Sequence, residues 1–144
     1  TIGDSSFWGC SSLMRVNIPL VTDLEESAFA NCTNLESVDM PRVTRIDGLA
    51  LTSCVNLERV NMAQVTRIGY NAFEDCNSLK SVDMPLLDDL EEYSFTNCAN
   101  LETAVIPITA HIHPDAFYNC NRNLLTIQFT GVKSGDLDKD EANK

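Results

Sequence analysis

The sequence predicts a solenoid, a fold in which short, similar coils stack side by side along one axis. Three observations support this prediction. The six cysteines lie at a constant interval of 22 residues, at positions 10, 32, 54, 76, 98 and 120. Residues 29–41 (FANCTNLESVDMP) are almost repeated as residues 73–85 (FEDCNSLKSVDMP). Apolar residues recur at the same interval, so like side chains would lie on like in neighbouring coils.

We call a set of residues that recur at this interval, one in each coil, a column. A single coil has too few apolar side chains to offset the entropy lost when its backbone is ordered, so the coils are expected to be stable only together. The apolar columns are Ile2, Leu24, Ile46, Ile68, Leu90, Ile112; Phe7, Phe29, Leu51, Phe73, Phe95, Phe117; Leu13, Leu35, Leu57, Leu79, Leu101; Val16, Val38, Val60, Val82, Ala104; and Ile18, Met40, Met62, Met84, Ile106.

Each coil is expected to contain three short segments. In the second coil, side chains of residues 35–40 (LESVDM) alternate between core and solvent, as in a strand, and Pro41 ends the ladder. Residues 43–46 (VTRI) are expected to form a second extended segment. Residues 26–32 (ESAFANC) carry a serine ahead of an Ala-Phe pair, which predicts a short helical turn on the opposite wall.

The charge excludes some classes of partner. The formal net charge is −11, which repels the phosphates of nucleic acids and anionic membrane surfaces. The sequence has no apolar run near the roughly 20 residues of a membrane span. We therefore expect no nucleic-acid partner and no membrane-embedded segment.

Residues 1–132 are expected to form one domain of six coils. Because Thr1 lies within a coil, we expect the chain to be a fragment of a longer array. Residues 133–144 (KSGDLDKDEANK) are expected to be a charged, disordered tail.

The combined pattern I-x-x-x-A-F-x-x-C-x-x-L-x-x-V-x-M-P over residues 2–130 resembles the BspA-type leucine-rich repeat of bacterial and protist surface proteins. The resemblance implies a β-rich leucine-rich-repeat solenoid, a right-handed curved coil with a parallel sheet on the concave face, and short strands and helical turns on the convex face. It also implies a secreted or cell-surface, adhesin-like protein, and it supplies no catalytic residues. The departures are Leu51, Ala63, Ala104 and one extra residue between Cys120 and Leu124.

The outward strand positions are the candidate binding residues, because solenoids usually engage partners through such a surface. The alternative is a solvated face that neutralises itself, since the arginines would lie diagonally beside Asp39 and Asp83. Neither column contains an aromatic anchor. The candidates are Arg15, Asn17, Ser37, Asp39, Arg59, Asn61, Ser81, Asp83, Thr103 and Gln128, with Val105 and Thr126 in the same columns.

Other columns predict structural roles. Each cysteine lies between a buried Phe or Leu and a buried Leu, so a ladder of reduced, buried thiols is expected; disulfides between neighbouring coils are the alternative. No two cysteines share a coil, which argues against zinc. Opposite charges are expected to meet at Asp23–Arg45, Arg67–Asp89 and Glu58–Lys80, in an otherwise ordinary solvated face.

Both histidines lie in one segment, residues 111–113 (HIH). If this segment is extended, they share two columns with acidic residues of the preceding coil. The resulting patch is a weak candidate for a transition-metal site, and ordinary surface residues are the alternative. The patch comprises Asp89, Glu91, His111 and His113.

These observations favour a non-catalytic binding module. No base stands beside the strand-face serines, so we expect no enzyme activity and no cofactor. The expected ligand is a protein or glycan of a host surface or the extracellular matrix. The alternative is a structural spacer, or a repeat element that associates end to end through open strand edges.

Overall fold

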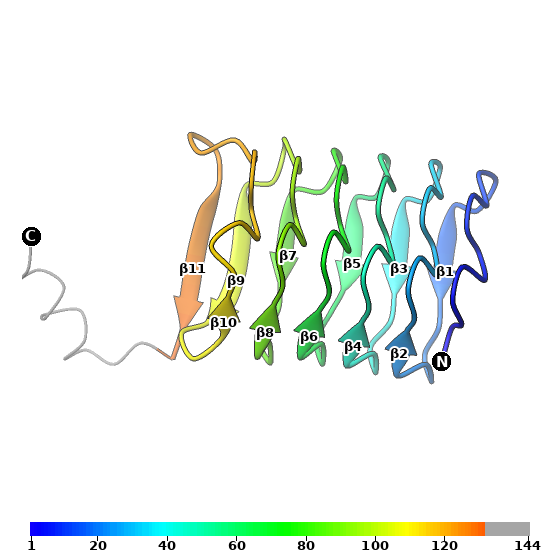
Figure 1. Ribbon diagram of the computed structural model, residues 1–144, viewed down its shortest axis with the longest axis horizontal. Helices are drawn as coiled ribbons and strands as arrows, with labels where there is room; N and C mark the ends of the chain where they lie inside the picture. Colours follow the sequence, from blue (N-terminus) through cyan, green and yellow to red (C-terminus); the bar gives the residue numbers. More distant parts are fainter. Residues whose placement is uncertain (132–144) are drawn as a thin grey trace, which may run out of the picture.

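The computed structural model describes residues 1–131 and shows coils stacked along one axis, with two rows of strands (Figure 1). We number the coils 1 to 6 by their cysteines, from Cys10 in coil 1 to Cys120 in coil 6. Every strand pairs in parallel with its equivalent in a neighbouring coil. The tail expected for residues 133–144 lies outside the described residues.

The first row forms two three-stranded sheets, in the orders β1-β3-β5 and β11-β9-β7. Its register pairs residues of the same column, such as Val16 with Val38, as the 22-residue period predicts. The extra residue of coil 6 is absorbed before β11, because Thr126 pairs with Thr103. The strands are β1 (Arg15–Asn17), β3 (Ser37–Asp39), β5 (Arg59–Asn61), β7 (Ser81–Asp83), β9 (Thr103–Pro107) and β11 (Thr126–Thr130).

The second row forms one five-stranded sheet, in the order β10-β8-β6-β4-β2. It confirms the second extended segment predicted from residues 43–46. Ile2 of coil 1 adds a single bridge to Leu24 at the edge. The strands are β2 (Asp23–Leu24), β4 (Arg45–Ile46), β6 (Arg67–Ile68), β8 (Asp89–Leu90) and β10 (His111–Ile112).

The third segment of each coil contains no helix within residues 1–131, so the prediction of helical turns was wrong. In coil 2 the Ala28 N–H bonds the Glu25 carbonyl within the coil at 3.2 Å, whereas the Phe29 N–H bonds the Ala50 carbonyl of coil 3 at 2.8 Å. Ser27 has a φ of 58°, in the left-handed region. Because an α-helix needs right-handed dihedrals and internal bonds throughout, the segment forms consecutive turns that bond alternately inward and to the next coil.

The prediction of a concave wall is not supported either. In Figure 1 the stack runs almost straight across the described residues. We therefore call the outward side of β1, β3, β5, β7, β9 and β11 the strand face, and the outward side of the five-stranded sheet the second wall.

Stacked aromatic rings run through the core. The Phe73 and Phe95 ring centroids lie 4.9 Å apart, and those of Phe95 and Phe117 lie 5.4 Å apart. Such pairs contribute about 0.5–1.5 kcal/mol beyond the area that they bury. Leu51 interrupts this column and separates the stack from the Phe7–Phe29 pair.

The cysteines are free thiols, and five of them lie buried. The Cys54 Sγ donates to the Phe29 carbonyl of the preceding coil at 3.2 Å. Cys76, Cys98 and Cys120 each make the same bond to the preceding coil. Burial raises the pKa of Cys54 to about 12. The column therefore acts as a set of small, protonated core residues.

Ser94 is an exception within the core. It occupies a column that otherwise holds alanine in coils 2, 3, 4 and 6, and it is fully buried. Its hydroxyl has no hydrogen-bond partner. A buried, unsatisfied hydroxyl carries a desolvation penalty of about 1–3 kcal/mol.

Replacing Ser94 with alanine is therefore expected to raise the free energy of unfolding by about 1 kcal/mol, measured by urea denaturation. The matched control, Ala72→Ser, introduces the same hydroxyl into the same column and is expected to lower it. A Ser94→Ala variant less stable than the parent would contradict this account.

A second prediction concerns alkaline pH. The ordinary thiol pKa is 9.0 and folding raises that of Cys54 to about 12, so above pH 9 the unfolded chain loses a proton that the native state keeps. Stability is then lost as pH rises from about 9, by up to about 1.4 kcal/mol per pH unit for this thiol. Cys54→Ala is expected to have a shallower slope of unfolding free energy against pH between 9 and 10.5. Equal slopes for parent and variant would refute the prediction.

Candidate functional site

The strand face brings the predicted binding residues together. Arg15, Ser37 and Arg59 are paired in register on β1, β3 and β5, and Ser81 pairs with Thr103 on the other sheet. The second column aligns in the same way, as Asn17, Asp39 and Asn61, and as Asp83, Val105 and Gln128. The ladder between these two groups is interrupted at β5 and β7.

The alternative interpretation, a strand face whose arginines are neutralised by Asp39 and Asp83, has no ion pair to support it within residues 1–131. Within residues 1–131, neither Arg15 nor Arg59 lies within 4.0 Å of a carboxylate. Asp39 instead accepts a hydrogen bond from the Asn61 amide at 3.0 Å. The guanidinium groups of this face are therefore exposed and available to a ligand.

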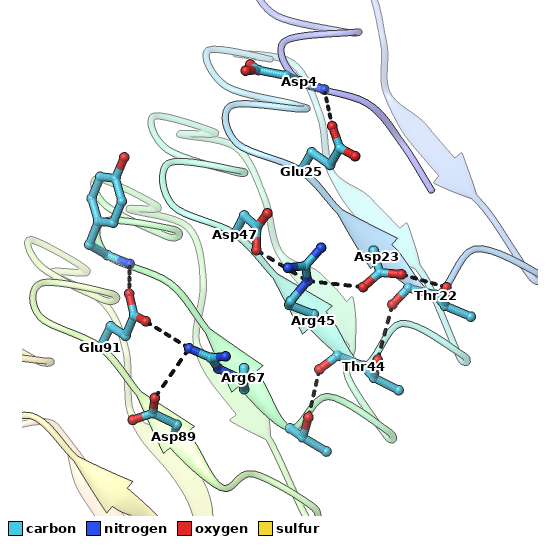
Figure 2. Close-up of polar contacts among 12 residues, drawn as sticks. Asp4, Thr22, Asp23, Glu25, Thr44, Arg45, Asp47, Arg67, Asp89 and Glu91 are labelled. Carbon is cyan, nitrogen blue, oxygen red and sulfur yellow. Dashed lines mark hydrogen bonds and ion pairs between the residues drawn. The ribbon is translucent and has the colours of Figure 1, made fainter.

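On the second wall the charges pair with one another (Figure 2). Arg45 Nε lies 3.1 Å from Asp23 and 3.5 Å from Asp47. Arg67 lies 3.5 Å from Glu91 and 3.9 Å from Asp89. Two of the three predicted ion pairs are thus confirmed, whereas Glu58 and Lys80 form none within the described residues.

The register places Arg45 opposite Arg67 on neighbouring strands. The ion pairs offset the repulsion between these two like charges. A hydrogen bond from Thr22, together with Arg45, lowers the pKa of the half-buried Asp23 carboxyl. Exposed pairs of this kind contribute about 0–1 kcal/mol each. The second wall is therefore a structural surface whose charged groups are already occupied.

Tyr70 closes over the neighbouring coil on this side, a feature that the sequence reasoning missed. Its ring covers Gly48, where an added Cβ would lie 2.3 Å from a ring carbon. Its hydroxyl bonds the Glu26 carboxylate two coils away, and this bond raises the pKa of Tyr70. The signal in the sequence was a glycine one coil before a tyrosine of the same column.

Gly69 of coil 4 lies directly against the backbone of coil 3. A Cβ added at Gly69 would lie 2.6 Å from the backbone nitrogen of Gly48. Contacts this short do not occur between real side chains and backbone, so a residue with a side chain at position 69 would push the coils apart. Glycine at both positions permits the approach.

The side chains of the histidine patch do not gather into a cluster of metal ligands within the described residues. Residues 1–131 contain no group of three or more histidine, cysteine, aspartate or glutamate side chains arranged to hold a metal ion. His111 Nδ1 lies 3.4 Å from Asp89, while His113 Nδ1 accepts the Asp115 N–H at 3.1 Å. One histidine nitrogen is thus already engaged in a local turn. The described residues also contain no helix long and apolar enough to cross a membrane.

Comparison with known families and structures gives a consistent result. Residues 1–124 match the model of the BspA-type leucine-rich repeat region, in six copies. No curated protein matches the chain.

Three solved structures have the same fold. A leucine-rich cell surface protein of Faecalibacterium prausnitzii is 30% identical, with a TM-score of 0.75 over 86% of this chain and 34% of its own. A leucine-rich repeat protein of T. pallidum is 28% identical, with a TM-score of 0.80 over 87% of this chain and 60% of its own. A leucine-rich repeat protein of Bacteroides ovatus, 22% identical, has a TM-score of 0.67 over 91% of this chain and 39% of its own. The chain thus spans less than two thirds of each.

The close approach of coils 3 and 4 generates a prediction. Gly69→Ala is expected to lower the free energy of unfolding by about 1–3 kcal/mol, because its methyl group meets backbone that cannot move independently. The control is Gly3→Ala in the same column, where the nearest atom is a Ser6 hydroxyl oxygen at 3.2 Å that can rotate away. Equal losses at both positions, measured by urea denaturation, would contradict the close packing.

Proposed function

The chain belongs to the BspA-type leucine-rich repeat family, and from this premise we propose that it is a non-catalytic recognition module that binds a protein or glycan through its strand face. The observation that carries the proposal is the contrast between the two surfaces. Arginines of the second wall are held between carboxylates. Arg15 and Arg59 of the strand face are exposed and lie in register with small polar side chains.

We extend the proposal to location. A secreted or cell-surface position fits the family, and one structural neighbour is a cell surface protein of F. prausnitzii. The partner would then be a component of a host surface or of the extracellular matrix. An adhesin-like role for the whole protein follows as part of this proposal.

The second candidate is a spacer or self-assembling repeat element, and one observation favours it. The Phe95 and Asn97 N–H groups bond carbonyls of coil 6, at 2.8 and 3.0 Å. Within residues 1–131 the equivalent N–H groups of Phe117 and Asn119 have no such backbone acceptor. This side of coil 6 would accept a further coil, or a second copy docked end to end. Light scattering separates these cases, because a particle mass that stays monomeric over a wide concentration range contradicts self-assembly.

The strand-face proposal predicts the loss of ligand capture in a variant with alanine at Arg15, Asp39, Arg59 and Asp83. The fragment would be immobilised and presented with purified extracellular-matrix proteins and a panel of glycans. We expect at least a tenfold loss of the captured ligand, since exposed charged groups at such a face supply charge-assisted hydrogen bonds.

The matched control replaces Arg42, Asp88, Glu92 and Arg122 with alanine, which also removes two cations and two anions but leaves the strand face intact. This control is expected to bind like the parent. Equal capture by the strand-face variant and the parent would place the binding site elsewhere. If no ligand is captured by either, the spacer is the better account.

A further inference from the structure

The step from coil 3 to coil 4 departs from the regular ladder of the strand face. At other steps a backbone N–H just before the strand bonds the preceding coil, as Glu58 bonds Glu36 at 2.8 Å and Glu102 bonds Lys80 at 2.7 Å. The equivalent bonds from the Lys80 and Ser81 N–H groups to Glu58 are absent within the described residues. Two backbone donors are therefore left over at this step.

Side chains at the same step also depart from their columns. Ser78 stands where coils 2, 3 and 5 have asparagine, and Lys80 stands where they have glutamate. A hollow of about 430 Å³ lies here, lined by Glu58, Arg59, Ser78, Lys80 and Asn100. The smaller serine and the missing ladder bonds together leave this space open.

The opposite wall keeps the two coils together at this step. On the second wall the Gly69 N–H bonds the Ile46 carbonyl of coil 3 at 2.8 Å, as the equivalent N–H groups do at the other steps. The ladder from β4 to β6 is intact there, whereas β5 and β7 are not paired. The two coils are thus hydrogen-bonded to each other at one wall and splayed at the other. We call the hollow between β5 and β7 the splayed step.

The chemistry of the splayed step suits a single oxyanion. Arg59 and Lys80 are exposed, and neither lies within 4.0 Å of a carboxylate in residues 1–131. Two cations beside two spare backbone N–H groups form an arrangement that favours an anionic oxygen group. Glu58 also lines the hollow, and its negative charge disfavours an anion that carries more than one charge.

Two further observations select the ligand class. The net charge of −11 repels a densely charged polymer, so the favoured anion is one isolated group on a largely neutral chain. The surrounding strand face holds small hydroxyl, amide and carboxylate side chains, which match sugar hydroxyls, and it lacks the aromatic anchors of protein interfaces. These features favour a glycan over a protein.

We propose that the splayed step is a subsite for the carboxylate of an acidic sugar within a glycan. Arg59, Lys80 and the N–H groups of Lys80 and Ser81 hold the carboxylate, while Ser78 and Asn100 lie beside the sugar hydroxyls. The proposal rests on the proposed strand-face function and names its ligand class.

The test is an NMR titration of the ¹⁵N-labelled chain with glucuronate and, separately, with glucose, which differs at one carbon. Glucuronate is expected to shift the Lys80 and Ser81 amide signals in a saturable way, and glucose is not. Arg59→Gln and Lys80→Gln are each expected to weaken glucuronate binding by roughly tenfold. The control Arg42→Gln removes an exposed arginine that does not line the hollow, and it is expected to bind like the parent.

Each other outcome overturns the proposal in a defined way. Equal responses to glucose and glucuronate would show that the carboxylate is not recognised. An unaltered affinity of Lys80→Gln for glucuronate would also contradict the subsite. If glucose 6-sulfate bound more tightly than glucuronate, the subsite would be one for a sulfate and not for a carboxylate. If N-acetylglutamate amide bound as tightly as glucuronate, the ligand class would be an acidic peptide and not a glycan. Glycan capture by the immobilised fragment without a glucuronate shift would overturn the subsite alone, whereas the shift without capture would overturn the wider strand-face function alone.

Discussion

The rest of the structure depends on hydrogen bonding between coils. No segment of a coil satisfies all of its backbone hydrogen-bonding groups by itself. The strands form hydrogen bonds to neighbouring coils, and in the turns every second N–H does so. This requirement explains why the period does not vary in coils 1 to 5, since an inserted residue would shift all later donors away from their acceptors. The insertion in coil 6 lies before β11, where a turn absorbs it. Stacked phenylalanines and buried thiols occupy the interior that this bonding defines.

The residues that could bind a ligand are those whose side chains point to solvent and are not needed for stacking the coils. On the second wall, arginines form ion pairs with carboxylates of neighbouring coils, so these charged groups are already occupied. On the strand face, Arg15 and Arg59 are exposed, and within residues 1–131 neither forms an ion pair with a carboxylate. At coils 3 and 4 a pair of glycines lies on one wall, and on the other the strand ladder is interrupted, which departs from the regular repeat. The proposed subsite and this departure are one feature of the fold.

Much of the fold could be predicted from the sequence, because columns of like residues specify register. The pairings of Arg15 with Ser37 and of Asp23 with Arg45 follow directly from the period. The turns were predicted wrongly as helical, since the left-handed backbone of Ser27 is not encoded by an unusual residue. The splayed step and the Tyr70–Gly48 contact depend on small differences in side-chain size between adjacent coils, and pattern analysis averages over such differences.

The most direct test of this account is the rate of amide hydrogen exchange along the strand face. Ladder amides such as those of Glu58 and Glu102 are expected to be protected, because each bonds the preceding coil. The amides of Lys80 and Ser81 are expected to exchange much faster than these equivalents. Protection at Lys80 and Ser81 equal to that at Glu58 and Glu102 would mean that the ladder is continuous, and it would contradict both the splayed step and the subsite built on it.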